Sequence, residues 1–193
     1  MAFNFDNSKK LALVKKDKSN KKAIDKKIKS LCEKINSNKN YFTTSSCSGR
    51  IVLIIDEEKK KPDLFLFRTH NKINFINLKK EIDKCKNKNL NRIMNKTVYF
   101  KQEPCILVVS CRDKENQWKL FSKAKNNGWK KSGILSLDKK LLAELMSTEN
   151  ISFPVINKGK LLVGDDFLKI VVKKANNNLK RGWEKIKRLE ILI

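Results

Sequence analysis

The sequence predicts an α+β fold, in which a mostly antiparallel or mixed sheet is flanked by helices at both ends of the chain. Apolar residues recur at helical spacing near each end, and the middle of the chain holds short apolar runs separated by charged turns. No G-x-G-x-x-G motif follows a strand, which argues against a Rossmann nucleotide pocket. With 193 residues, 40% of them hydrophobic, we expect one domain spanning residues 1–193.

The first helix is expected over residues 19–36, with Ser19 as its N-cap. Lysines occupy the other faces of this segment, but one face is apolar and is expected to pack on the core. The apolar residues recur at spacings of four, three and four: Ile24, Ile28, Leu31 and Ile35.

A hairpin is expected next. The apolar run 51–55 is typical of a buried strand, residues 56–63 form a charged turn, and residues 64–70 suit a second strand that pairs with the first. The end of the second strand of a hairpin lies beside the start of the first. His70 is therefore expected close to residues 45–50.

The chain then continues with a weakly amphipathic helix over residues 76–91. Its expected apolar face is Ile76, Ile82 and Cys85. Residues 98–113 predict one or two strands, because Pro104 cannot donate a ladder hydrogen bond and interrupts the pattern.

The last third predicts a helix over residues 115–129, closed by Gly128 at the position after the C-cap. Residues 132–138 and 141–148 suit a hairpin, although residues 141–146 could also be helical by propensity.

Residues 151–166 contain a turn at Lys158–Gly159 between two short strands. A long helix is expected from about Asp166 onward, with basic residues around one apolar stripe. The stripe consists of Leu168, Val171, Val172, Ala175, Leu179, Trp183 and Ile186.

The charge is strongly basic. Lysine and arginine number 45 against 20 acidic residues, for a formal net charge of +25. Such an excess attracts polyanions, with nucleic acid as the commonest partner and an anionic membrane surface as the second. Solvated lysines from a biased composition are the alternative. If lysines on the first and last helices hold RNA phosphates, affinity should fall steeply with salt.

The five cysteines are odd in number and include no C-x-x-C pair, and His70 is the only histidine that could join them. We therefore expect no metal site and no disulfide framework, but reduced thiols of an intracellular protein. The N-terminus is too polar for a signal peptide, and no apolar run approaches the ~20 residues of a membrane span. A cytoplasmic protein is expected.

The segment YFTTSSCSGRIVLII, residues 41–55, predicts a turn rich in small hydroxyl side chains before a strand. Around Gly49 such a turn lets backbone N–H groups converge on an anion, and Arg50 adds a planar fork for carboxylate or phosphate. Cys47, beside this arginine, could act as a nucleophile with His70 as its base. An ordinary turn that begins a strand is the alternative.

Other candidates carry less information. Arg112 ends an apolar run and could face a site, or could be an ordinary exposed arginine. Trp118, Trp129 and Trp183 could stack on bases. Trp129 beside Lys130 suits this role best, although a core tryptophan fits its pattern equally well. No Walker A motif or paired carboxylates occur, so phosphoryl transfer and hydrolysis lose support.

Several blocks resemble the tRNA wybutosine-synthesizing protein 3 family, the methyltransferases of the wyosine pathway. The most specific is TSSCSGR within residues 41–51. The others follow in order along nearly the whole chain: DKS at 17–19 with Asp25, RTHNK, EPCILVVSCRD, NNGWKKSGI, NKGKLLV and DDFLKIVVKKANNNL. Lys22 and Trp129 depart from the family pattern, in which Gly and Phe are common.

The resemblance implies a non-Rossmann enzyme that uses S-adenosylmethionine to methylate a ring nitrogen, of the N-4 type. The acceptor is a tricyclic guanine derivative just 3′ of the anticodon of phenylalanine tRNA. Matching positions imply His70, Arg50 and Arg112 as catalytic residues. They also imply Ser45, Ser46, Cys47, Gly49, Ser132 and Gly133 as cofactor-binding residues, and Lys158 and Gly159 as substrate-binding residues. Trp129 and Lys130 join the substrate-binding set because of the stacking and charge argument above, not because they match the family.

Methyl transfer by in-line displacement requires positioning more than a strong acid or base. On this interpretation Arg50 and residues 45–49 bind the cofactor's carboxylate or the tRNA backbone, and His70 or Arg112 orients the acceptor base or takes up its proton. Two alternatives stay open. One is a non-catalytic basic RNA-binding module, and the other is a thiol enzyme built on Cys47 and His70.

Overall fold

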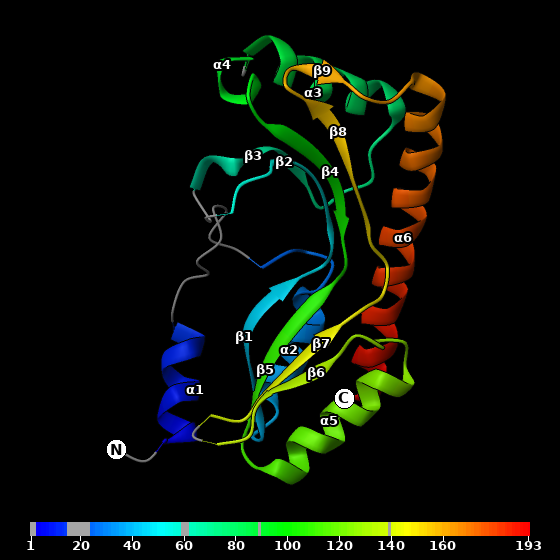
Figure 1. Ribbon diagram of the computed structural model, residues 1–193. Helices are drawn as coiled ribbons and strands as arrows, with labels where there is room; N and C mark the ends of the chain where they lie inside the picture. Colours follow the sequence, from blue (N-terminus) through cyan, green and yellow to red (C-terminus); the bar gives the residue numbers. More distant parts are fainter. Residues whose placement is uncertain (1–2, 15–23, 59–61, 89, 139) are drawn as a thin grey trace. The chain divides into compact units, whose positions relative to one another are not determined.

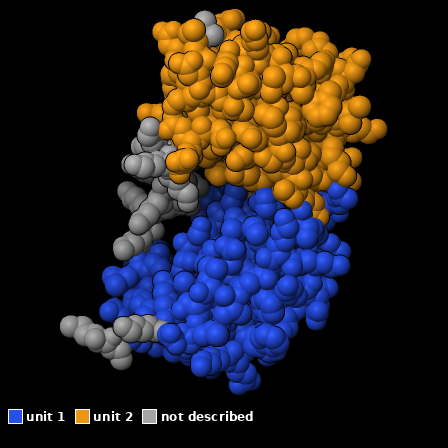
Figure 2. Space-filling view, in the orientation of Figure 1, with its two compact units in different colours: residues 1–48, 104–148, 181–193 blue, residues 49–103, 149–180 orange. Residues whose placement is uncertain are grey.

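A computed structural model describes residues 3–14, 24–58, 62–88, 90–138 and 140–193. The chain divides into two compact units, each assembled from separate segments (Figure 2). Unit 1 comprises residues 1–48, 104–148 and 181–193, and unit 2 comprises residues 49–103 and 149–180. The α+β class is confirmed. The single domain expected from the sequence stays a prediction.

Unit 1 is built on a four-stranded antiparallel sheet with the strand order β1-β5-β7-β6 (Figure 1). The strands are β1 Tyr41–Cys47, β5 Ile106–Cys111, β6 Gly133–Ser136 and β7 Leu142–Met146. The helices of this unit are α1 Phe5–Val14, α2 Lys29–Ser37, α5 Lys114–Asn126 and the last part of α6 Asp165–Leu192. β6 and β7 form the expected hairpin, which excludes the helical alternative for residues 141–146.

One face of this sheet carries the core of unit 1. Leu107, Val109, Ala143 and Leu145 point to this face and are fully buried. Ile28, Leu31 and Ile35 pack against the same core, as their spacing predicts. Helix α2 is shorter than expected, since it begins at Lys29, and the predicted N-cap Ser19 lies outside the described residues.

Helix α5 ends as the sequence predicts. Gly128 has a φ of +92°, a conformation that L side chains rarely adopt. Its N–H donates to Lys125 O (3.3 Å), and the N–H of Trp129 donates to Ala124 O (3.1 Å). These two bonds form a Schellman motif, which satisfies carbonyl groups at the helix end and directs Trp129 back into the core.

Unit 2 is built on a five-stranded antiparallel sheet with the order β3-β2-β4-β8-β9. The strands are β2 Arg50–Ile55, β3 Phe65–Thr69, β4 Thr97–Glu103, β8 Ile151–Asn157 and β9 Lys160–Leu161, and the helical elements are η1 Pro62–Leu64, α3 Phe75–Lys88, α4 Leu90–Ile93 and the first part of α6. The predicted hairpin of β2 and β3 is confirmed, with Ile51 opposite Thr69. Lys158 and Gly159 form the expected tight turn, and both have positive φ.

The helices of unit 2 confirm one sequence pattern and correct another. The stripe of α6 is buried as expected, for example at Leu168 and Leu179. In α3, Ile82 and Cys85 are buried, but Ile76 is 73% exposed and Leu78 takes its place in the core. The apolar periodicity of this Lys-rich segment is weak, so the prediction assigned Ile76 instead of Leu78 to the buried face.

None of the five cysteines, all of which lie in described residues, forms a disulfide. Burial raises the pKa of the Cys85 thiol to about 11 and that of the Cys111 thiol to about 12. The reactive thiolate is therefore scarcer at pH 8 in the folded protein than in an unfolded chain.

We predict that iodoacetamide at pH 8 labels Cys85 and Cys111 much more slowly in the native protein than in urea, because burial both raises their pKa and blocks access. Peptide mapping by mass spectrometry measures the labelling of each thiol. Half-exposed Cys47 serves as the internal control and should react in both states. Equal native and denatured rates at Cys111 would contradict its burial.

Candidate functional site

Residues 41–50 form a strand and a two-residue connection, so the expected hydroxyl-rich turn is wrong. β1 extends to Cys47 and β2 begins at Arg50, which leaves only Ser48 and Gly49 between them. β1 pairs with β5 over most of its length, with a bulge between Thr43 and Ser45. β1 is an edge strand, so one side of its backbone bonds to β5 and the N–H groups alternate between the two sides of the extended strand. They therefore do not converge on an anion as predicted.

The register of unit 1 places a row of residues across the outer face of its sheet, opposite the core. Ser45 lies opposite Val108, Val108 opposite Glu144, and Glu144 opposite Gly133. Directly paired residues share a face of an antiparallel sheet. Ser45 and Gly133 therefore lie on the same face, roughly 14 Å apart across three strand spacings. A Cβ added at Gly133 meets no atom within 4 Å, so the sheet surface is open there.

Cys47 lies one step further along this outer face, in register with Ile106 and Met146. Ser46 points the other way, because it pairs with the fully buried Leu107. The predicted cofactor-binding group is thus divided by the pleat: Ser45 and Cys47 share the outer face with Gly133, and Ser46 does not.

Glu144 is a candidate that the sequence analysis missed. It is half-buried at the middle of the outer face, between Val108 and Gly133. The signal was present, because Ala143 and Leu145 are apolar and a strand alternates its faces. Glu144 was not predicted as a site residue because residues 141–146 could be either helix or strand by sequence, and the face of Glu144 depends on that choice.

Ser48 is the last residue of the 41–55 segment that belongs to unit 1. Its backbone N–H and its hydroxyl both donate to the Asp25 carboxylate, at 3.0 and 3.2 Å. Its carbonyl accepts from Trp183 Nε1 at 3.1 Å, and the ammonium of Lys27 lies 4.9 Å from the centroid of that indole. Trp183 thus has a structural partner, and Ser48 is held at three atoms.

In unit 2, Gly49, Arg50 and His70 come together as the hairpin predicts. His70 Nδ1 lies 3.1 Å from Gly49 O. A carbonyl oxygen only accepts, so Nδ1 carries the proton, and Nε2 is the basic nitrogen of the neutral ring. Gly49 has a φ of +89°, which explains why a glycine stands here.

Arg50 is held in place within this corner. Its Nε donates to the carboxylate of Glu103, the residue opposite it on β4, and its guanidinium lies 5.0 Å from the Phe65 ring centroid. Nη1 and Nη2 make no hydrogen bond within the described residues. A half-buried, oriented fork with two unused donor groups is suited to a phosphate or carboxylate.

Arg112 has a structural task in unit 1. Its guanidinium binds both carboxylate oxygens of Asp6, at 3.0 and 2.5 Å, donates to Lys39 O, and lies 4.5 Å from the Phe5 ring centroid. The hydrogen bond to Arg112 lowers the pKa of Asp6 and raises that of Arg112. Arg112 therefore anchors α1, a helix that the sequence analysis did not predict. Its catalytic role stays a prediction.

Trp129 is fully buried, so the stacking role considered for it is corrected in favour of a core tryptophan. Its indole N–H donates to Lys185 O at 3.4 Å. Ser132 is also buried, where its hydroxyl donates to Trp129 O (2.5 Å) and accepts from Met146 N (3.1 Å). Of the predicted site residues Trp129, Lys130 and Ser132, only Lys130 is exposed.

Lys158 and Gly159 lie at the other end of unit 2's sheet from Arg50. Arg50 pairs with Glu103 at one end of β4, and Asn157 pairs with Thr97 at the other. Six residues of extended strand separate these ends by roughly 20 Å. The structure therefore does not bring the predicted substrate-binding turn together with the Arg50–His70 corner.

The fold and these clusters define a non-Rossmann α+β protein with an oriented arginine and a tautomer-fixed histidine at a strand corner. Residues 6–193 match the sequence pattern of the family Methyltransferase TYW3, so the chain belongs to this family. The resemblance inferred from the sequence motifs is thereby confirmed, as is the methyltransferase class. Among the described helices, none combines the length and apolar character needed to cross a membrane.

Relatives and solved structures agree with this assignment. A protein of Thermococcus sibiricus named tRNA(Phe) 7-((3-amino-3-carboxypropyl)-4-demethylwyosine(37)-N(4))-methyltransferase is 39% identical, covering 97% of this chain and 93% of its own. A Danio rerio protein named tRNA wybutosine-synthesizing protein 3 homolog is 33% identical over 96% of this chain and 72% of its own. A solved structure of a Pyrococcus horikoshii protein matches with a TM-score of 0.84 at 34% identity, covering 97% and 93% of the two chains.

Proposed function

We propose that this protein methylates N4 of 7-(3-amino-3-carboxypropyl)-4-demethylwyosine at position 37 of phenylalanine tRNA, with S-adenosylmethionine as methyl donor. The observation that carries the proposal is the family match over residues 6–193, which contains both candidate clusters. The substrate follows from the names of relatives such as the Thermococcus sibiricus enzyme. We also propose that both units act as one RNA-binding methyltransferase domain in the cytoplasm.

The outer face of unit 1's sheet fits the methyl donor. S-adenosylmethionine supplies an electrophilic methyl carbon on a sulfonium, and it carries an ammonium and a carboxylate. Glu144 offers a carboxylate for the ammonium, and Ser45 a hydroxyl for hydrogen bonding. Cys47 is assigned as a lining residue beside them, and Gly133 leaves the surface open. These residues bind and orient, which is the task that in-line displacement sets the protein.

The Arg50–His70 corner of unit 2 fits the tRNA. Arg50 presents Nη1 and Nη2 to a backbone phosphate, while Glu103 keeps its plane fixed. In the proposed displacement, the acceptor ring nitrogen would bond to the methyl carbon as the carbon–sulfur bond breaks and the thioether S-adenosylhomocysteine leaves. His70 Nε2 would accept the proton that the nitrogen loses. The bond from Nδ1 to Gly49 O fixes the tautomer that makes this possible.

The remaining predicted residues fall into two groups. Lys158 and Gly159 are proposed as tRNA contacts distant from the reaction, since an extended polyanion can reach both ends of a sheet. Lys130 is proposed as a phosphate contact at the surface. For Arg112, Trp129 and Ser132 we propose positioning roles, because their polar groups are engaged within unit 1.

Calorimetry with S-adenosylmethionine tests the proposal against its main alternative, a non-catalytic RNA-binding module. We expect saturable one-to-one binding that Glu144→Gln weakens by about tenfold, since it removes a charge-assisted contact. Asp138→Asn, which removes a carboxylate from the turn after β6, serves as the matched control. A wild-type protein that binds tRNA but not S-adenosylmethionine would favour the RNA-binding module.

Cys47→Ser separates the methyltransferase from a thiol enzyme. We predict that this variant keeps methyl transfer within about fivefold of wild type, because a lining thiol is replaced by a group of similar size. The measurement is methyl incorporation into tRNA under single-turnover conditions. Complete loss of activity, with S-adenosylmethionine binding intact, would instead identify Cys47 as a nucleophile.

A further inference from the structure

The outward face of α5 carries an exposed tryptophan that neither the core nor the candidate site uses. Trp118 is 64% exposed, and its ring centroid lies 5.4 Å from that of Phe121. The opposite face of the helix is buried through Gln117, Leu120 and Ala124. A large exposed indole on a folded helix contributes little to stability, and its flat face is available to a partner.

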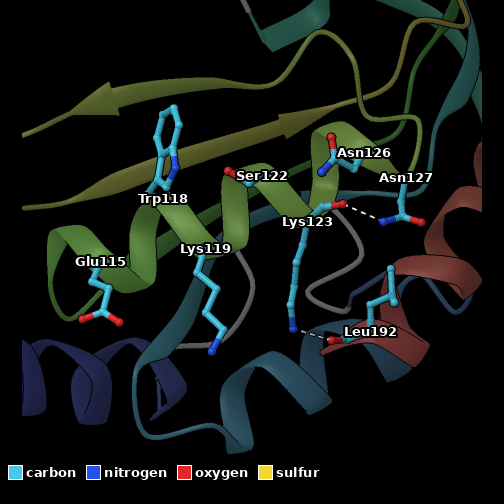
Figure 3. A pocket seen from close by; sticks show the side chains of 8 residues that line it. All are labelled: Glu115, Trp118, Lys119, Ser122, Lys123, Asn126, Asn127 and Leu192. Carbon is cyan, nitrogen blue, oxygen red and sulfur yellow. Dashed lines mark hydrogen bonds between the residues drawn. The ribbon is translucent and has the colours of Figure 1, made fainter.

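This tryptophan borders a surface groove of about 480 Å³ along the helix (Figure 3). The groove is lined by Glu115, Trp118, Lys119, Ser122, Lys123 and Asn126, with Asn127 and Leu192 at its end. These helical positions recur at spacings of three and one, which places them on a single face. In Figure 3 the indole of Trp118 and the side chains of Lys119 and Lys123 extend to opposite sides of this face.

The charged side chains of this groove are mostly positive. Lys119 makes no ion pair within the described part of the chain, and Lys123 donates to the carbonyl of Leu192 at 2.7 Å. Glu115 is the one acidic residue of the groove and lies one turn before Lys119. An aromatic surface for a base next to lysines for the phosphates is the combination by which proteins bind single-stranded nucleic acid.

Two other surface grooves lack this combination. In the groove along α3, Lys79 pairs with Asp165 and Lys84 with Glu81, whereas Lys80 has no ion pair among the described residues. The one aromatic ring of this groove, Phe75, is half-buried and is covered by lysine ammonium groups. In the groove beside α4, Lys96 pairs with Glu57, and no aromatic residue contributes. Among these three grooves, only that of α5 joins an exposed ring to an unpaired lysine.

We propose that the outward face of α5 is a docking surface for an unpaired segment of RNA, with Trp118 stacking on a base and Lys119 and Lys123 contacting phosphates. The inference rests on the proposed function in that it takes the tRNA substrate as the RNA. The net charge of +25 supports a polyanion as occupant. The surface adds binding energy away from the modified base, so it affects affinity for tRNA and not the chemical step.

Fluorescence-anisotropy binding to a phenylalanine tRNA transcript tests the stacking. Trp118→Ala is expected to weaken binding by at least about fivefold, the lower range for one stacked base, and Trp118→Phe to retain most of the affinity. Ile76→Ala, which removes a 73% exposed side chain from α3, is the matched control and should bind like wild type. Unchanged binding by Trp118→Ala would overturn the proposal.

Two further readouts separate RNA docking from other roles. A short oligouridylate should quench the tryptophan fluorescence of wild type but much less that of Trp118→Phe, because Trp129 is buried and half-buried Trp183 is held by Ser48 O and covered by Lys27. Lys119→Gln should lower the salt slope of tRNA binding by about one, and the control Lys80→Gln should not. A change in sedimentation of Trp118→Ala with unchanged RNA binding would overturn the proposal, since the face would then bind a second copy.

This outcome and that of the proposed function are distinguishable. Trp118-dependent tRNA binding without any methyl transfer by wild type would contradict the proposed function and support the docking surface. Methyl transfer by wild type, with equal tRNA affinity in Trp118→Ala, would do the reverse.

Discussion

Replacing Arg50 by alanine lowers kcat/KM for methyl transfer to tRNA by about 10- to 100-fold. This range corresponds to the loss of charge-assisted hydrogen bonds to a phosphate. The change removes the only fork that Glu103 holds oriented in this corner of unit 2. Single-turnover kinetics with radiolabelled methyl donor measure the effect. Arg68→Ala is the matched control, because Arg68 also lies over the Phe65 ring, at 5.1 Å, but is exposed on β3. Equal losses in both variants would show a general charge effect.

His70 in the same corner offers a sharper version of this test. Asparagine at position 70 preserves a donor that can reach Gly49 O but lacks the distal nitrogen. If His70 accepts the proton through Nε2, both His70→Ala and His70→Asn lose most of the activity. If it only positions Gly49, His70→Asn keeps activity and His70→Ala does not. Full activity in both Arg50→Ala and His70→Ala would remove this corner from the active site.

Trp129→Ala has the largest expected effect on stability, a loss of about 3–5 kcal/mol in the free energy of unfolding. The indole is fully buried among the residues that pack on unit 1's sheet, and its N–H is bonded to a backbone carbonyl. Removing it leaves a large cavity in the core and loses the indole hydrogen bond to the Lys185 carbonyl, which keeps its place in the ladder of α6. Urea denaturation followed by circular dichroism measures the shift.

Trp118→Ala is the matched control for this prediction, since the same side chain is removed from an exposed position on α5. It should change the free energy of unfolding by no more than about 0.5 kcal/mol. Trp129→Phe should lose less than Trp129→Ala, because an aromatic ring still fills most of the site. A Trp129→Ala protein as stable as wild type would contradict the packing of unit 1 described above.

Local chemistry made several parts of the fold predictable. The β2–β3 hairpin follows from two apolar runs and a charged turn, and it correctly placed His70 beside Gly49. Gly128 and Gly159 mark positions of positive φ that few other residues adopt. The apolar stripe of α6 is long enough for its period to be unambiguous.

Tertiary pairing decided the parts that the sequence did not predict. Residues 43–48 are small hydroxyl residues and cysteine, whose local preference is for turns, yet pairing with β5 makes most of them a strand. That strand assignment separates Ser45 from Ser46 and brings Glu144 into the same row as Ser45. Arg112 was predicted to face a site, but its partner Asp6 lies more than a hundred residues earlier in the chain. No local pattern reports such a pair.

The most direct measurement of the central claim is mass spectrometry of nucleosides from phenylalanine tRNA that carries 7-(3-amino-3-carboxypropyl)-4-demethylwyosine. The tRNA is incubated with the purified protein and S-adenosylmethionine, with Arg68→Ala and Arg50→Ala in parallel. The account predicts that wild type and Arg68→Ala convert the nucleoside at position 37 to a product one methyl group heavier, methylated at N4, and that Arg50→Ala does so much more slowly. An unmethylated nucleoside after incubation with a wild-type protein that binds both the tRNA and S-adenosylmethionine would contradict it.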